Sequence, residues 1–199
     1  NTTTVSITRN SANNDGGRFI FNKSRGASNG SDVVVQNGDT IGQIVFCAND
    51  GTDSDSISAS ILSSINGTPG ANDVPGQLIF STTADGANSP TTRLTIDSAG
   101  LVKLPDNGKF TVGNNTDLEI FHNGTNNIIQ SDTGDLQINA GNSAGNVEIN
   151  VNNSVNNNTR ETSAKFIKNG AVELYYDNSK KLNTVSNGIA VHGTLLDLI

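Results

Sequence analysis

Three carboxylates stand close together in the polar stretch from Ala48 to Ser56, at Asp50, Asp53 and Asp55. Ca²⁺ prefers oxygen ligands, and a short loop of Asp, Ser and Gly residues can supply several of them. The spacing differs from that of an EF-hand, and no glutamate closes the loop. The stretch is therefore interpreted as a solvated loop or, alternatively, as a cation site.

The chain has two histidines, His122 and His192, and each follows the apolar residues of an expected strand. Three copies of one histidine around a threefold axis could bind a metal ion. The alternative is a packed or half-exposed side chain at a strand end. No cofactor is expected.

Three glutamates, Glu119, Glu148 and Glu173, lie in expected strands. Glycosidases use two carboxylates that flank a sugar-binding cleft, and such pairs could form between strands or chains. However, Glu119 and Glu173 are equivalent positions of an internal repeat, which favours a structural face. The chain also has no Trp and only two Tyr to stack on sugars.

Other catalytic patterns are absent from the sequence. It contains no Ser-His-Asp order, Cys-x-x-Cys, P-loop or dinucleotide-binding motif. We therefore expect no enzyme, and we keep cleavage of a surface polysaccharide as the alternative.

Charge and hydropathy exclude further classes of function. The net charge is −7 and there is no basic run, which argues against nucleic-acid binding. No apolar run approaches the length of a membrane span, so membrane insertion is not expected. The lone Cys47 lies in an apolar strand pattern and is expected to be buried. The chain begins at Asn1 without Met, which suggests a piece of a longer protein.

The composition favours strands joined by turns. Ile and Val far outnumber Leu, and Asn and Gly are abundant. The stretch Ile57–Ile65 fits a helical period as well, but its Ser content favours a strand. The expected strands are Arg18–Lys23, Val33–Gln36, Thr40–Cys47, Ile57–Ile65, Gln77–Thr82, Thr91–Asp97, Leu101–Leu104, Lys109–Val112, Leu118–Phe121, Ile128–Gln130, Leu136–Ile138, Val147–Val151, Lys165–Lys168, Val172–Tyr176 and Gly188–Val191.

One strand–turn unit occurs twice. The block Leu118–Asn123 has a counterpart 54 residues later in Val172–Asp177, and the full units span about 117–138 and 171–193. Alternation places Leu118, Ile120 and His122 on one strand face. Each unit has too few large apolar groups for a core of its own. It must stack along a single-chain solenoid or among identical chains.

The pattern of strands and loops suggests three parts. Residues 1–16 form an N-terminal arm or edge strand, residues 17–100 form a β-sandwich-like module, and residues 101–199 form an elongated β-repeat shaft. The predicted fold class is therefore all-β.

Several segments resemble phage fibre proteins. Residues 35–46, 66–86 and 89–97 resemble a module common in bacteriophage tail fibres, which often precedes a self-cleaving chaperone domain. Residues 117–124 and 173–177 resemble the strand–turn repeats of fibres from phages of marine cyanobacteria. Together these matches cover most of residues 17–193, and no chaperone-domain motif follows Gly193.

The resemblance implies a structural virion protein that attaches the phage to its host. It implies an intertwined homotrimer with a shaft of the β-prism or triple-stranded β-helix type. The partners would be other virion or tail proteins and a glycan or receptor on the host surface. The alternatives are a tailspike-type enzyme that degrades polysaccharide, a capsid fibre or decoration protein, and a bacterial adhesin.

Long loops are the expected receptor contacts, because loops tolerate variation on a rigid scaffold. They are residues 24–32, 48–56 and 66–76. The candidate receptor-binding residues are Ser24, Arg25, Asn29, Asp50, Asp53, Asp55, Asn66 and Asn72.

Overall fold

The structure, a computed structural model, describes residues 3–141, 145–152 and 160–194. Within these ranges the chain has thirteen strands and no helix, so none of it could cross a membrane as a helix. The strands are β1 (Thr40–Ala48), β2 (Ser56–Ile65), β3 (Gly76–Thr82), β4 (Thr91–Ile96), β5 (Val102–Lys103), β6 (Lys109–Val112), β7 (Leu118–His122), β8 (Asn127–Ser131), β9 (Val147–Asn152), β10 (Arg160–Phe166), β11 (Val172–Tyr176), β12 (Ser179–Val185) and β13 (Gly188–Val191).

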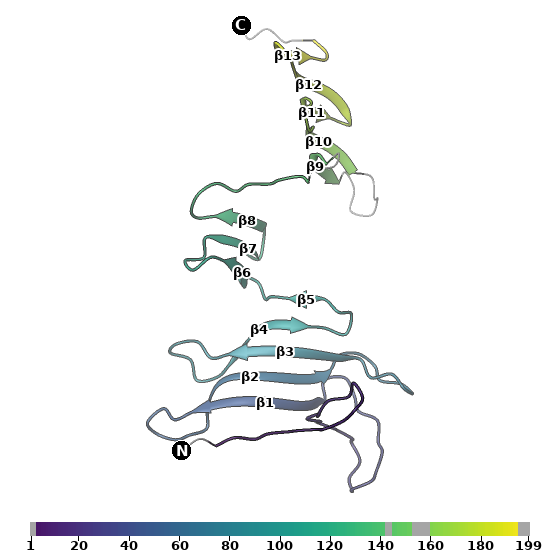
Figure 1. Cartoon of the computed structure of the whole chain (residues 1–199), viewed down its shortest axis with the longest axis vertical. Coiled ribbons are helices and arrows are strands. Elements are labelled where there is room, and N and C mark those ends of the chain that lie inside the picture. The colour runs from purple at the N-terminus through teal and green to yellow at the C-terminus, as the bar shows by residue number, and fades with distance from the viewer. Residues whose placement is uncertain (1–2, 142–144, 153–159, 195–199) are drawn as a thin grey trace. The chain divides into compact units, whose positions relative to one another are not determined.

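The strands form three antiparallel sheets, each a meander in which every strand pairs with its neighbours in sequence (Figure 1). The first sheet contains β1 to β5, the second β6 to β8, and the third β9 to β13. The chain divides into two compact units, Asn1–Thr133 and Gly134–Ile199. The all-β prediction is confirmed.

The first sheet has one apolar face and one mostly polar face. Register places Ile44, Ile61, Phe80 and Leu94 in one row across four strands. Because side chains alternate along a strand, Leu78, Ile96 and Val102 share this face. The opposite face carries Gln43, Val45, Ser60, Leu62, Ser64, Gln77, Ile79, Ser81, Thr92, Thr95 and Lys103.

The second sheet repeats this division. A row of Phe110, Ile120 and Ile129 crosses its three strands on the apolar face. Val112 and Leu118 form the next row on the same side. The polar face carries Lys109, Thr111, Glu119 and Gln130 beside Phe121 and Ile128.

The third sheet divides in the same way. Its apolar face has a row that crosses all five strands, formed by Ile149, Ala164, Leu174, Leu182 and Val191. The polar face has a parallel row of Glu148, Lys165, Glu173, Asn183 and Ala190.

The apolar faces remain largely open to solvent. Among the described residues only Val35, Ile65 and Ala164 are buried apolar side chains. In the central row of the second sheet, Phe110 is 61% exposed and Ile120 is 45% exposed. A single sheet cannot cover its own face, and no described strand supplies a second layer. The two-layer sandwich expected from the sequence is therefore not seen within one chain.

Several expected strands differ from the observed ones. Residues 18–23, 33–36 and 136–138 contain no strand, because no neighbouring segment forms a ladder with them. β10 begins before the expected Lys165–Lys168, and β12 was not predicted, because Lys180 and Lys181 break its apolar alternation. β2 confirms the strand interpretation of Ile57–Ile65.

Cys47 is exposed, so the expectation of a buried thiol is wrong for the single chain. It lies in β1, which is an edge strand of the first sheet, and its neighbour across the ladder is Ile57 of β2.

The segment before β1 is extended and rests on the first sheet. The Phe21 ring lies against Gly42, where a side chain would collide with it, and Phe19 meets Phe21 edge-on at 4.8 Å between ring centres. Residues 3–16 of the predicted arm contain no strand. Residues 1–2 of the arm and residues 195–199 of the predicted shaft lie outside the described residues.

The first sheet continues past residue 100, where the sequence predicts a change from module to shaft. Thr95 and Ile96 of β4 pair with Lys103 and Val102 of β5. The division of the chain into a module and a shaft stays a prediction.

Candidate functional site

The structure places two of the three predicted receptor loops, residues 24–32 and residues 66–76, at the same end of the first sheet. The Asn66–Gly76 loop leaves the end of β2, where the chain also enters β1. Gly38 N donates to Ile65 O at 3.0 Å, and Gly67 N donates to the Asn37 side-chain oxygen at 3.0 Å. The Ala48–Ser56 loop joins β1 to β2 at the opposite end. It therefore cannot contribute to the same site within one chain.

A groove of about 280 Å³ lies between these two loops, and we call it the loop groove. Pro69, Gly70 and Val74 line one side. The other side is lined by Asn22, Lys23, Ser24, Asp32, Val33, Val34 and Val35. The groove thus combines three exposed valines, Val33, Val34 and Val74, with the cation of Lys23 and the carboxylate of Asp32.

Ser24 and Arg25 hold the first loop in place. Ser24 Oγ donates to Ser31 O at 2.7 Å and accepts from Val33 N at 2.9 Å. The Arg25 guanidinium donates two hydrogen bonds to the Asp39 carboxylate, at 2.7 and 2.6 Å. Arg25, followed by the Gln36 backbone N–H, holds the pKa of Asp39 well below its ordinary value. This pair was not predicted from the sequence, where its one local signal is the Asn-Gly-Asp turn at residues 37–39.

Asn29 lies in an exposed turn closed by a hydrogen bond from Ser31 N to Ser28 O. In the second loop, Asn72 is exposed with φ of 58°. The Asn66 side-chain oxygen accepts from Ser98 N at 3.2 Å and from Ser98 Oγ at 2.9 Å. Asn29 and Asn72 are therefore free to meet a partner, whereas Asn66 partly serves to anchor its loop.

Two of the three aspartates of the other loop, Asp50 and Asp53, accept hydrogen bonds from the loop backbone, and Asp53 Oδ1 accepts from Asp55 N at 3.3 Å. Asp50 Oδ1 accepts from Thr52 N at 2.8 Å and from Asp53 N at 3.2 Å, and Oδ2 accepts from Ser56 Oγ. These bonds, Thr52 first, lower the pKa of Asp50. The part of the chain that the structure describes has no group of three or more His, Cys, Asp or Glu residues that could hold a metal. A cation site here stays a prediction.

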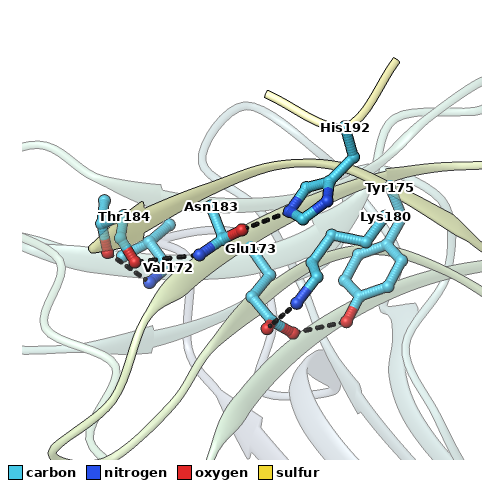
Figure 2. Close-up of polar contacts among 7 residues, drawn as sticks. All are labelled: Val172, Glu173, Tyr175, Lys180, Asn183, Thr184 and His192. Carbon is cyan, nitrogen blue, oxygen red and sulfur yellow. Dashed lines mark hydrogen bonds and ion pairs between the residues drawn. The ribbon is translucent and has the colours of Figure 1, made fainter. Parts of the chain in front are cut away.

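The two histidines occupy different environments. His122 ends β7 on the apolar face, and its Nδ1 lies 3.0 Å from Asp106 Oδ1 and 3.2 Å from Gly124 N. His192 follows β13 on the polar face, where its Nε2 lies 2.5 Å from Asn183 Oδ1 (Figure 2). The 54-residue period pairs His122 with Tyr176 instead. The two histidines are therefore not equivalent positions of the repeat, and metal binding by either stays a prediction.

Each of the three glutamates contacts a lysine on a neighbouring strand. Glu119 is 3% exposed, and its oxygens lie 2.8 and 2.6 Å from Lys109 Nζ. Lys109 Nζ also lies 4.8 Å above the centre of the Phe121 ring. Glu148 lies 2.7 Å from Lys165 Nζ.

Glu173 has two partners, shown in Figure 2. The Tyr175 hydroxyl donates to its Oε2, and Lys180 Nζ lies 2.9 Å from its Oε1. Tyr175 first and Lys180 second lower the pKa of Glu173, while Glu173 raises the pKa of both partners. Such a carboxylate stays ionised and holds the Tyr175 and Lys180 side chains in place. This is a structural role, which the sequence favoured for this position of the repeat.

No protein-family model matches the chain, and no curated protein matches its sequence. Among solved structures, the chain is similar to the carboxy-terminal domain of the bacteriophage T5 L-shaped tail fibre, with a TM-score of 0.44 and 18% identity. The match covers 69% of this chain and 48% of that chain, so this chain spans about half the length of that structure.

Proposed function

We propose that this chain is a structural segment of a bacteriophage tail fibre that assembles as a homotrimer and attaches the virion to its host. One observation carries the proposal. Each of three successive sheets has an apolar face that the described residues of the chain cover only in part, so that Ile44, Ile120 and Leu174 are 45%, 45% and 44% exposed.

Uncovered apolar faces favour assembly on energetic grounds. Burying one large apolar side chain contributes about 1.5 to 3 kcal/mol, and each face offers several. A second copy carries the same faces in the same order along the chain. Copies of the chain can therefore cover one another's apolar faces, sheet by sheet, with closed symmetry. The number of three copies comes from the sequence resemblance.

The polar faces suit the outside of such an assembly. In the second and third sheets they carry cross-strand ion pairs, Lys109 with Glu119, Lys165 with Glu148 and Lys180 with Glu173. The net charge of −7 per chain supports solubility of the assembly.

Attachment would use the loop groove and the exposed turns at Asn29 and Asn72. Three copies per fibre present three such sites, which raises avidity for a repeated surface glycan without new contacts. Localisation would be the virion tail, with other tail proteins as neighbours. The proposal assigns no catalytic step to this chain.

The decisive test is the mass in solution, measured by light scattering after size exclusion. A mass near three times the 20.7 kDa of one chain supports the proposal. A monodisperse monomer would overturn it, because the apolar faces would then remain in water. Incubation with host glycan and an assay for new reducing ends tests the enzyme alternative on the same sample.

Attachment is tested with fluorescent protein on a panel of marine cyanobacteria, the hosts implied by the sequence resemblance. Binding to some strains and loss of binding on mutation of the loop groove support the attachment role. A trimer that binds no strain, on a panel that includes the host of the parent phage, would leave only a structural role.

A further inference from the structure

A second hollow lies on the polar face of the first sheet, and it shares no lining residue with the loop groove. It has a volume of about 400 Å³. Register brings its strand residues together, because Thr95 of β4 pairs with Lys103 of β5 and with Ile79 of β3. Alternation from Ile79 places Gln77 on the same face.

The hollow contains polar groups that the fold leaves unused. Within the described part of the chain, the hydroxyl groups of Thr92 and Thr95 have no partner. The Gln77 side chain donates to Ser64 Oγ at 3.0 Å, and its carbonyl oxygen has no described partner. Asn66 accepts from Ser98 through its oxygen, so its amide N–H groups are also unused. Donors and acceptors therefore converge on one small space.

The charges that line the hollow neutralise each other. Asp97 pairs with Lys103, and its Oδ1 accepts from Ala99 N at 2.9 Å and from Leu101 N at 3.0 Å. The ion pair therefore already stabilises the β4–β5 turn. A strongly charged ligand finds no unpaired counter-charge here, so a neutral ligand is favoured.

Leu104 and Pro105 supply the remaining wall. A polar rim beside a small apolar surface complements a pyranose ring, which has hydroxyl groups around its edge and C–H groups on its faces. The volume lies within the usual range for small-ligand sites, about 300 to 1,000 Å³.

We propose that this hollow binds one neutral hexopyranose residue of a host surface glycan. Thr92, Thr95, Gln77 and Asn66 would hydrogen-bond its hydroxyl groups, and Leu104 and Pro105 would contact its ring. The inference rests on the proposed function, which places the polar face on the outside of the assembly, where a glycan can reach it.

The test is saturation-transfer NMR on the full chain with the methyl glycopyranosides of glucose, galactose and mannose as probes. We expect signal transfer to at least one probe, and shifts of the Gln77 and Lys103 backbone amides. The double variant Thr92→Val/Thr95→Val removes two hydroxyl groups and keeps the side-chain volume. Its affinity should fall about tenfold, since two neutral hydrogen bonds are lost.

Thr91→Val is the matched control. Thr91 lies in the same strand but pairs with Thr82 on the opposite face and does not line the hollow. Its substitution should leave the affinity unchanged.

Absence of transfer from all three probes, or transfer that the double variant leaves unchanged, would overturn the sugar site. The mass and cell-binding measurements on the same preparation keep the two proposals separate. A trimer that binds cells and no probe refutes only the sugar site, whereas a monomer refutes the proposed function itself.

Discussion

The hairpins β7–β8 and β11–β12 are two copies of one unit that have diverged in their turns. β7 (Leu118–His122) and β11 (Val172–Tyr176) begin and end at positions that differ by 54 residues. The first hairpin closes with four residues between its strands, and the second closes with two, Asp177 and Asn178.

The two turns use different chemistry. In the first, Asn123 Oδ1 accepts from Thr125 N and Asn126 N, and Gly124 has φ of 88°. In the second, Asp177 and Asn178 have φ of 51° and 54°, the positive pair that a two-residue hairpin requires. A register irregularity between Leu174 and Tyr175 accommodates the shorter turn.

The chemistry of the two faces survives this change. Ile120 and Leu174 are repeat equivalents on the apolar face, and they are 45% and 44% exposed. Glu119 and Glu173 are equivalents on the polar face, and each contacts a lysine. The lysines come from different strands, β6 in one copy and β12 in the other. The repeat therefore preserves which strand face is apolar, whereas the length of the turn and the lysine partner of the glutamate differ between the two copies.

The largest expected effect is from a charge on the preserved apolar face. Ile120→Asp or Leu174→Asp places a carboxylate where copies of the chain would meet, and an unpaired buried charge costs several kcal/mol. Either variant should therefore lower the mass in light scattering from three chains to one.

Gln43→Asp is the control for this prediction. It adds the same charge to the polar face of the first sheet, where Gln43 is exposed, and should leave the mass unchanged. If Ile120→Asp also remains trimeric, the apolar face of the second sheet is not the contact between chains.

A smaller difference is expected between the two glutamates. Glu119→Gln should reduce the free energy of unfolding by about 1 to 2 kcal/mol, because the buried amide pairs less strongly with Lys109. Glu173→Gln should cost less, because the Glu173 side chain is 12% exposed whereas that of Glu119 is 5% exposed. Urea unfolding of both variants measures the difference, and equal losses would contradict the role of burial. The double variant Lys109→Met/Glu119→Gln shows how much of the loss is an unpaired lysine.

Substitutions in the two turns should change the free energy of unfolding in opposite directions. Gly124→Ala should destabilise by about 1 kcal/mol, because a left-handed φ strains any L side chain. No atom lies within 4 Å of the added methyl, so the cost is conformational only. Asp177→Gly relaxes a positive φ and should stabilise by about 0.5 kcal/mol. Thermal unfolding of both variants measures the two signs, and a loss in the second would show that the Asp177 side chain has a role of its own.

The smallest effect concerns pH. The pKa of Glu173 lies below its ordinary value of 4.5, through Tyr175 first and Lys180 second. A lowered folded pKa stabilises the fold fully above the unfolded pKa, and this contribution is lost as the pH falls through the folded pKa. The melting temperature should therefore fall between about pH 6 and pH 3, and less so in Glu173→Gln than in wild type. Identical slopes for the two proteins would assign the acid sensitivity to other groups, such as Asp39.

Much of the fold follows from local sequence signals. β6, β11 and β13 have the predicted bounds, because each combines apolar residues with a flanking Asn or Gly turn. β12 escaped prediction because two adjacent lysines interrupt its alternation, and a bulge between Leu174 and Tyr175 compensates for them in the structure. The segment Val33–Gln36 has the composition of a strand but no partner in the chain, and composition alone cannot reveal that.

The candidate sites were harder to predict from the sequence than the strands. Loop composition predicted Ser24, Asn29, Asn66 and Asn72 as contact residues, but only the structure shows that residues from both loops line one groove. The hollow around Thr95 was missed, because alternate polar residues in a strand also describe an ordinary solvent face. Its signal was the coincidence of such residues in three adjacent strands, which requires the register.

The meander topology also has a consequence for how the chain acquires its structure. Every described pairing joins strands that are adjacent in sequence, so each sheet forms by closing short loops, with a small loss of chain entropy. Folding that depends on local contacts is fast. Strand pairing can therefore follow the order in which the ribosome releases the chain, and in the proposed trimer the encounter of separate chains would be the slow, concentration-dependent step.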